Sequence, residues 1–245
     1  MQAARPHIPV LLSEVLQAFD GLDLKVFFEG TVGAGGHAEA ILQAHNEIET
    51  YLACDRDPAA LLLAKKNLSA WSEKIEWVKG AYGDLERHLD ARKIHEIDGF
   101  LIDIGISSMQ IDVRERGFSF LGDAPLDMRM DPDGEVTAAM LVNSAPEAEL
   151  ARIFYEYGEE RRSRQVAKAV VEARRKRKFK TTGELVDVVK KVATRGKLHP
   201  ATLVFQALRI AVNDELGQLQ KGLNSAMRRL RVGGRMAVIS FHSLE

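Results

Sequence analysis

Residues 25–37 read KVFFEGTVGAGGH, and this stretch decides the fold. An apolar, β-prone run at 26–28 is followed by an acid, Glu29, and then by a glycine-rich turn that opens a helical pattern. Glycine tolerates positive φ and lets a ligand approach bare backbone, and the start of a helix offers unpaired N–H donors. The strand, turn and helix therefore predict a site for a nucleotide-like ligand, although purely structural turns share this pattern.

Length and composition limit the other possibilities. The chain has 245 residues, 46% of them hydrophobic, and a formal net charge of −1, so any nucleic acid must be held by a local basic patch. The single cysteine, Cys54, excludes an internal disulfide and is typical of a reducing compartment. No apolar run reaches bilayer length and the N-terminal residues lack the apolar segment of a signal peptide, so we expect a cytoplasmic protein without a membrane partner.

Four further runs are typical of strands, at residues 50–54, 75–79, 98–103 and 236–240. The first three alternate with helical segments, and the run at 98–103 is almost continuously apolar, as a central parallel strand should be. The sequence thus predicts an α/β fold, a doubly wound parallel sheet interrupted by an inserted helical region.

Acids follow three of these strands. Glu29, Asp55 and Asp103 each stand at a carboxyl end, the edge at which open parallel sheets bind ligands. Asp55 is placed to bind both ribose hydroxyls of a nucleotide, whereas Asp57 is expected to cap the next helix. Tyr82 follows the third strand and either lies along an adenine ring or simply packs.

The middle of the chain is different. Residues 110–135 are rich in Asp, Arg, Gly and Pro and predict a functional loop. Capping-box patterns at 144–147 and 181–184 predict two helices, and a basic helix lies between them within 161–180. That helix is either an RNA-binding surface or an ordinary solvated face. Its candidate RNA-binding residues are Arg161, Arg162, Arg174, Arg175 and Arg177.

A glycine turn with a ribose-binding acid suits either a dinucleotide or S-adenosylmethionine. A pyrophosphate prefers the positive end of a helix, whereas a sulfonium cation prefers nearby carboxylates, so Glu29 and Asp103 favour S-adenosylmethionine. Two alternatives stay open on the residues alone: an NAD-dependent oxidoreductase, and a non-catalytic RNA-binding factor of ribosome assembly.

Longer motifs are more specific than the glycine turn. They are GTVGAGGH at 30–37, DRDP at 55–58, ERGFSF at 115–120, PLDMRMD at 125–131, YGEE at 157–160, HPAT at 199–202, FQALRI at 205–210 and SFHSLE at 240–245. On these motifs the chain resembles the bacterial 16S ribosomal RNA cytosine-N4 methyltransferases, which act at the decoding centre of the small subunit. The resemblance covers nearly the whole chain.

The resemblance implies a Rossmann-like methyltransferase that uses S-adenosylmethionine, needs no metal, and methylates the N4 amine of a cytidine in small-subunit ribosomal RNA. The substrate is naked RNA or an assembled subunit, and a homodimer is left open. The cofactor contacts that it implies are Gly35, Gly36, His37, Asp55, Tyr82, Asp103 and Gln110. The implied catalytic group is Asp103 with Ser107 and Ser108, placed to accept a hydrogen bond from the amine, although Asp103 alternatively serves only the cofactor. Phe118 and Phe120 are candidates for the pocket of an unstacked cytidine, or equally for the core.

The resemblance also divides the chain. Residues 1–110 are expected to form the first part of the methyltransferase core, residues 111–199 a helical insertion for RNA recognition, and residues 200–245 the second part of the core. Family members continue past the FHSLE motif, so this sequence is expected to lack the last strands of the sheet.

Overall fold

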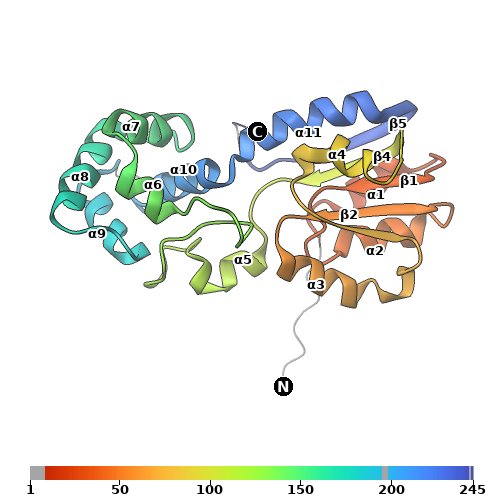
Figure 1. The fold of residues 1–245 in the computed structure, drawn as a ribbon, viewed down its shortest axis with the longest axis horizontal. Coiled ribbons are helices and arrows are strands. Elements are labelled where there is room, and N and C mark those ends of the chain that lie inside the picture. The colour runs from red at the N-terminus through yellow and green to blue at the C-terminus, as the bar shows by residue number, and fades with distance from the viewer. Residues whose placement is uncertain (1–8, 195–197, 243, 245) are drawn as a thin grey trace, which may run out of the picture. The chain divides into compact units, whose positions relative to one another are not determined.

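The computed structural model describes residues 9–194, 198–242 and 244. The chain divides into two compact units, which Figure 1 shows as a sheet with its helices and as a group of helices. We call them the sheet unit, formed by residues up to Gly105 and from Gly217 onward, and the helical unit, Ile106–Leu216.

The sheet unit contains five parallel strands in the order β3-β2-β1-β4-β5. The strands are β1 (Val26–Glu29), β2 (Thr50–Asp55), β3 (Ile75–Lys79), β4 (Ile97–Asp103) and β5 (Leu230–Ile239). The order reverses between β1 and β4, the kind of switch point at which open α/β sheets bind ligands. The predicted α/β fold is confirmed. One boundary differs, because β5 begins before the residue 236 that the sequence predicts, and Gly233 lies inside the strand with φ 84°.

Helices cover both faces of this sheet. They are α1 (Leu12–Phe19), α2 (Gly36–Ala44), α3 (Pro58–Asn67), α4 (Leu85–Asp90) and α11 (Glu215–Arg229), with short 3₁₀ turns at Ser69–Trp71 and Tyr82–Asp84. Phe27 and Tyr51 stack at 5.1 Å in the core that α1, α2 and α3 close, whereas Phe28 and Phe100 stack at 5.7 Å in the core that α4 and α11 close. Since successive strand residues face opposite sides, a sheet buried on both faces needs the continuous apolar runs seen here.

The helical unit has one core of its own. Its elements are α5 (Ser108–Asp112), a 3₁₀ turn at Arg114–Arg116, α6 (Ala138–Ser144), α7 (Glu147–Glu156), α8 (Ser163–Lys176), α9 (Thr182–Val192) and α10 (Thr202–Asn213). Helix α7 packs against α8 and α10, and α8 packs against α9. Leu150, Phe154, Val166 and Leu208 are fully buried among them. No helix within the described residues has both the length and the hydropathy of a membrane span.

The helical unit extends further than the insertion that the sequence predicts at 111–199. Helix α10 belongs to it because Val204, Phe205 and Leu208 are buried in its core. Asp214 adopts φ 50° and ends α10, so α10 and α11 are separate helices.

One of the two predicted capping boxes is confirmed. Thr181 accepts the N–H of Glu184 at the start of α9, and the Glu184 carboxylate returns to the N–H of Thr181. The box predicted at Ser144 is wrong, because Ser144 ends α6 and its hydroxyl donates to the Met140 carbonyl at 2.7 Å. Pro146 precedes α7 instead, without a side-chain cap.

Candidate active site

The glycine turn of the sheet unit combines a tight packing contact with an open position. A Cβ added at Gly36 would lie 2.5 Å from the Pro9 side chain, so the segment leading into α1 packs against the turn. Gly33 has φ 53° and Gly35 has φ 89°, conformations that glycine adopts without strain. An added Cβ at Gly33 would meet nothing nearer than a carbonyl oxygen at 4.0 Å, so the turn is open there.

Asp55 braces this turn from the end of β2. Its Oδ2 accepts the N–H of Gly33 at 3.0 Å, and its Oδ1 accepts the N–H of Asp57 at 2.9 Å. Burial raises the pKa of the Asp55 carboxyl to about 6. Asp57 caps α3 by accepting the N–H of Ala59 at 3.0 Å, as predicted. Asp55 therefore stands against the open part of the turn, where a ligand of that turn would meet it.

Glu29 is buried at the end of β1, where it accepts the Tyr51 hydroxyl at 2.8 Å. Burial is the largest cause that raises its pKa to about 8, and the charges of Asp55 and Asp103 raise it further. The carboxyls at the ends of β1, β2 and β4 thus lie close enough to act on one another. Glu29 holds a proton at neutral pH when no cation is present.

Thr31 links two strand ends, a role that was not predicted from the sequence. Its Oγ1 accepts the backbone N–H of Asp103 at 2.7 Å, which ties the end of β1 to the end of β4. Thr31 stands where methyltransferase glycine motifs carry their first glycine. That departure from the motif was the available signal, because a hydroxyl in this position can bond across the crevice.

Two residues predicted to contact a cofactor also have packing partners. The Tyr82 ring is 7% exposed and lies against Gly222 of α11, where an added Cβ would come within 2.7 Å of the ring. The His37 Nε2 donates to the Val10 carbonyl at 2.9 Å, and burial lowers the pKa of the imidazole, which is therefore neutral. Both side chains hold the walls of the crevice in place.

Ser107 and Gln110 start helix α5 in the helical unit. The N–H of Ser107 donates to Gln110 Oε1 at 3.2 Å, and the N–H of Gln110 donates to Ser107 Oγ at 3.3 Å. This is a capping box that the sequence analysis missed, although the S-x-x-Q spacing is its signature. Both side chains are engaged locally, and the side chain of Ser108 lies outside the described part of the chain.

Some of the positive charges in the basic run within 161–180 have partners in the structure. Arg174 donates to the Val142 carbonyl at 2.7 Å, and Arg177 pairs with Glu184 at 2.9 Å. By contrast, Arg161 and Arg175 are exposed and have no ion-pair partner within residues 9–194 and 198–242. The run therefore contains arginines that serve the fold and arginines that do not.

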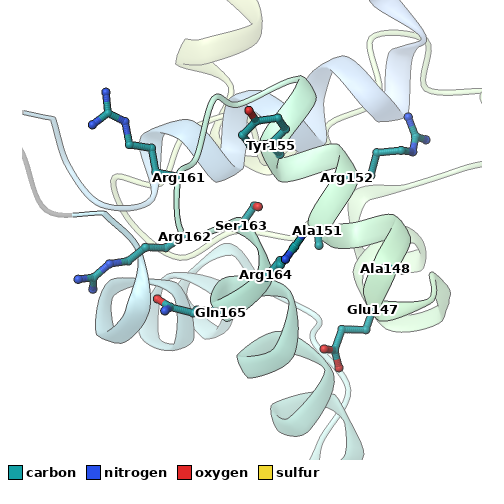
Figure 2. Close-up of a pocket in the computed structure, with 10 residues that line it drawn as sticks. All are labelled: Glu147, Ala148, Ala151, Arg152, Tyr155, Arg161, Arg162, Ser163, Arg164 and Gln165. Atoms are coloured by element: carbon teal, nitrogen blue, oxygen red, sulfur yellow. The ribbon is translucent and has the colours of Figure 1, made fainter.

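A pocket opens between α7 and the first turn of α8. Figure 2 shows its lining, and its volume is about 1040 Å³. The lining residues are Glu147, Ala148, Ala151, Arg152, Tyr155, Arg161, Arg162, Ser163, Arg164 and Gln165. Two of the predicted RNA-binding residues, Arg161 and Arg162, thus meet in one concave site, whereas Arg174, Arg175 and Arg177 are not among its lining residues.

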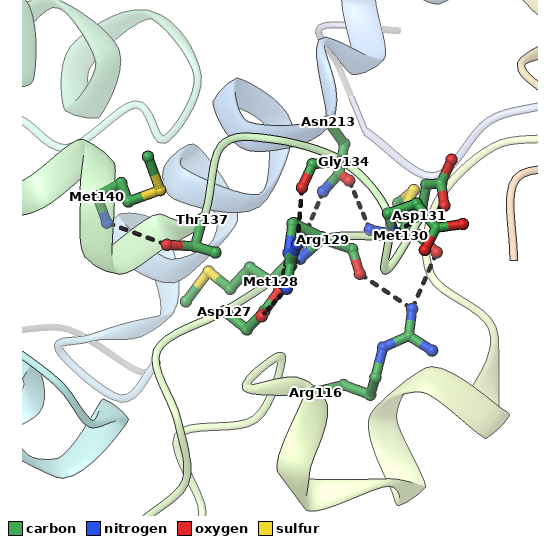
Figure 3. Close-up of polar contacts among 11 residues, drawn as sticks. Arg116, Asp127, Met128, Arg129, Met130, Asp131, Gly134, Thr137, Met140 and Asn213 are labelled. Carbon is green, nitrogen blue, oxygen red and sulfur yellow. Dashed lines mark hydrogen bonds and ion pairs between the residues drawn. The ribbon is translucent and has the colours of Figure 1, made fainter.

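Hydrogen bonds and an ion pair hold the PLDMRMD motif, as Figure 3 shows. Arg129 bonds both oxygens of Asp127 at 2.8 and 2.7 Å and also donates to the Gly134 carbonyl. From α10, Asn213 accepts the N–H of Met130 at 2.7 Å and donates to the Met128 carbonyl at 2.8 Å. Met128 has φ 63°, a left-handed conformation that these contacts stabilise.

The predicted functional loop at 110–135 is therefore partly core. Leu126 and Met128 are fully buried, and Phe118 is 9% exposed in the same cluster, which is the core alternative for that ring. Phe120 is partly buried and stacks on His199, with ring centroids 4.7 Å apart. Arg116 and Asp127 bond backbone groups of the loop, and Leu126, Met128 and Met130 are buried, whereas Ile111, Val113 and Leu121 are exposed.

A parallel sheet with this strand order, a glycine turn after β1 and acids at the carboxyl ends defines a Rossmann-like methyltransferase fold. The model of the MraW methylase family matches residues 4–245. The chain belongs to the MraW methylase family.

Relatives are similar over almost the whole chain. Proteins named ribosomal RNA small subunit methyltransferase H are 51% identical in Paramagnetospirillum magneticum, where 98% of this chain and 76% of the relative are covered, and 49% identical in Geobacter sulfurreducens, where 98% and 78% are covered. A solved rRNA methylase from Streptococcus thermophilus is 17% identical, with a TM-score of 0.32 over 49% of this chain and 71% of that one. The assignment rests on the family and the relatives, which also exclude the oxidoreductase alternative.

Glu29→Gln is expected to flatten the pH dependence of stability. Below the ordinary glutamate pKa of 4.5 both the folded and unfolded states are protonated, and between 4.5 and about 8 only the folded state holds the proton. The free energy of unfolding of the wild type therefore falls as pH rises through this window, by about 1.4 kcal/mol for each pH unit at most. Urea unfolding at pH 5 and pH 8 measures the difference. The same slope in both proteins would show that Glu29 titrates normally.

Asn213→Ala is expected to destabilise the helical unit by about 2–4 kcal/mol, since it leaves the buried N–H of Met130 and carbonyl of Met128 without this partner. Denaturant unfolding measures the loss, and amide exchange should quicken at Met130. Gln43→Ala, which removes an exposed amide from α2, is the control and should stay within about 0.5 kcal/mol of wild type. An equal effect of the two variants would contradict an anchoring role for Asn213.

Proposed function

We propose that the chain transfers a methyl group from S-adenosylmethionine to the N4 amine of a cytidine in small-subunit ribosomal RNA. The observation that carries this proposal is the acidic crevice of the sheet unit, in which Glu29, Asp55 and Asp103 meet beside an open glycine turn. The relatives are named ribosomal RNA small subunit methyltransferase H, and this name supports an RNA substrate.

The residues present fit S-adenosylmethionine better than a dinucleotide. The Asp55 and Asp103 carboxylates would repel a pyrophosphate, whereas a ligand that carries cationic groups and a ribose suits them. Burial and the neighbouring charges of Asp55 and Asp103 raise the pKa of Glu29, and a cation beside these groups would favour its charged form. Bound there, S-adenosylmethionine would supply an electrophilic methyl group.

We assign cofactor binding to the glycine turn and to Asp55. The Asp55 carboxylate keeps lone pairs beyond the two that accept Gly33 and Asp57, and these suit ribose hydroxyls. Gly35, Gly36 and His37 would form the turn, Tyr82 a wall, and Gln110 a further contact. Because Gln110 is already bonded to Ser107, its contribution would come through the placement of α5.

Asp103 is proposed to orient the target amine. The cytosine N4 lone pair is delocalised into the ring, so the chain needs a hydrogen-bond acceptor that turns the N–H bonds more than it needs a strong base. The bond from its own N–H to Thr31 fixes the backbone of Asp103, and positioning of this kind can contribute about 7–11 kcal/mol to lowering a barrier. The alternative role, in cofactor binding alone, predicts a different kinetic result.

On the helical unit, Arg161, Arg162 and Arg175 are the proposed contacts to RNA phosphates. Arg174 and Arg177 are weaker candidates, because a backbone carbonyl at 2.7 Å and a carboxylate at 2.9 Å already engage them, whereas the contact of Arg162 with the Val192 carbonyl is longer, at 3.5 Å. Phosphate contacts position RNA without reading its sequence, so base choice would lie elsewhere.

The experiment that tests the function is transfer of a radiolabelled methyl group to small ribosomal subunits that lack the modification, followed by nucleoside analysis. Label in N4-methylcytidine supports the proposal. Binding of subunits without transfer would favour the non-catalytic assembly factor, and label in another nucleoside would overturn the choice of N4.

Asp55→Asn and Asp55→Ala separate the two tasks of this side chain. Removing a charged hydrogen-bond partner costs about 1.5–3 kcal/mol, so Asp55→Ala should weaken binding of S-adenosylmethionine roughly ten- to a hundredfold in calorimetry. Asp55→Asn keeps one acceptor for the turn and should lose less stability in thermal melting. An unchanged dissociation constant in folded Asp55→Ala would exclude the ribose contact.

Asp103→Asn is expected to reduce kcat far more than cofactor affinity if Asp103 orients the amine. The measurement pairs single-turnover methyl transfer with calorimetry of S-adenosylhomocysteine. Losses of equal size in both would return Asp103 to the cofactor site alone, and normal turnover would exclude both roles.

A further inference from the structure

The pocket between α7 and α8 has a polar group that the fold leaves unused. Ser163 is 6% exposed, it lines the pocket, and its hydroxyl has no hydrogen-bond partner among the described residues. Figure 2 shows this hydroxyl amid the ring of lining side chains. The hydroxyl oxygen is open to the pocket rather than fully enclosed, so it can donate a hydrogen bond to a ligand there.

The same pocket contains an uncapped helix start. Helix α8 has no side-chain hydrogen bond at its N-cap, Arg162, and no acid in its first turn. Helix α9 of the same unit differs, since Thr181 and Glu184 cap it reciprocally. The buried Glu160 carboxylate accepts the N–H of Arg162, and the Glu160 carbonyl accepts the N–H of Ser163. Within the described residues, the N–H groups of Arg164 and Gln165 are therefore the ones that remain for an anion.

Cations surround this helix start. Arg161 and Arg164 are exposed and have no ion-pair partner in the part of the chain that the structure describes. Across the pocket, Arg152 pairs with Glu156 at 2.6 Å, and Glu147 is the one acid of the lining. The net charge of the lining side chains is positive, which suits a phosphate rather than a cation.

An aromatic ring and the size of the pocket point to more than a lone anion. Tyr155 lines the pocket and is 63% exposed, whereas the neighbouring Phe154 is fully buried. A volume of about 1040 Å³ is far larger than one phosphate group needs and suits a nucleotide within a chain. Exposed aromatic rings beside basic side chains are how proteins bind single-stranded RNA.

We propose that this pocket binds one nucleotide of single-stranded RNA, with its phosphate on Ser163 and the α8 N-terminus and its base against Tyr155. The inference rests on the proposed function for the choice of RNA, and it names the part of the substrate that the helical unit holds. Arg161 and Arg164 neutralise the phosphate and its neighbour along the chain.

The test measures binding of a short, fluorescently labelled single-stranded RNA over a range of salt concentrations. Arg161→Gln with Arg164→Gln should make the log–log salt slope shallower by about 1.4, since each phosphate contact on a single strand contributes about 0.7. Lys190→Gln with Lys191→Gln removes the same charge from exposed positions of α9 and is the matched control. A wild-type slope in the arginine variant, or an equal change in the control, would overturn the pocket.

Ser163→Ala should weaken RNA binding about three- to tenfold at every salt concentration with an unchanged slope, because a neutral hydrogen-bond donor is lost. Tyr155→Leu should weaken binding of RNA about tenfold and leave an abasic strand of equal length unaffected. Thermal melting checks that Ser163→Ala is folded. Wild-type affinity in both variants would reduce the pocket to a solvated surface.

Methyl transfer by the wild type separates this inference from the proposed function. If the wild type binds RNA through these residues but transfers no methyl group, the proposed function fails and the pocket stands. If it methylates subunits and the pocket variants keep wild-type affinity and KM, the pocket fails and the function stands. Competition by inorganic phosphate at equal strength against RNA and abasic RNA would indicate a simple anion site and overturn the base contact.

Discussion

Side chains that accept backbone N–H groups across neighbouring strand ends hold the acidic crevice together. The Asp55 carboxylate, at the end of β2, accepts the N–H of Gly33 in the turn after β1. The Thr31 hydroxyl, in that same turn, accepts the N–H of Asp103 at the end of β4. Backbone groups beyond the last ladder bond need partners, and here the partners belong to the crevice itself. Burial, together with the charges of Asp55 and Asp103, raises the pKa of Glu29 to about 8. A fixed, partly protonated acid cluster is adapted to a cationic ligand, because such a ligand removes the penalty that the protein otherwise carries.

Much of the sheet unit could be predicted because its signals are local. An apolar run, an acid and a glycine turn each act within a few residues, so the strands, the acid positions and the cap at Asp57 follow from pattern alone. The break between α10 and α11 could not be predicted, since the apolar period continues through it. Asn213 ends α10 by bonding the loop at Met128 and Met130, which lie 85 and 83 residues away in the chain.

The sequence indicated which residues belong to the candidate site better than it indicated which contacts they make. Tyr82 suits an adenine or a core, and the structure packs it on Gly222, a residue far along the chain. The S/T-x-x-E pattern occurs at Ser144 and at Thr181 with opposite outcomes, because Ser144 is already the last residue of α6. Ser107 and Gln110 show the converse, a local capping box hidden by an expectation of function. The spacing of residues shows which hydrogen bonds a side chain is able to make, and the surrounding fold determines which of them forms.

The dipole of α8 acts differently on the basic residues at the two ends of the helix. At the C-terminal end, basic side chains meet the partial negative charge of the last carbonyls, so Arg174 and its neighbours are favourable there without any ligand. At the N-terminal end the dipole is positive, and the buried Glu160 carboxylate accepts the Arg162 N–H there, while Arg161 and Arg164 add two exposed positive charges. The fold therefore accounts for the basic residues at the C-terminal end of the helix more fully than for those at its start. An anion from outside the chain would offset this excess of positive charge, and the Ser163 hydroxyl, which lines the same pocket, could donate a hydrogen bond to a phosphate oxygen.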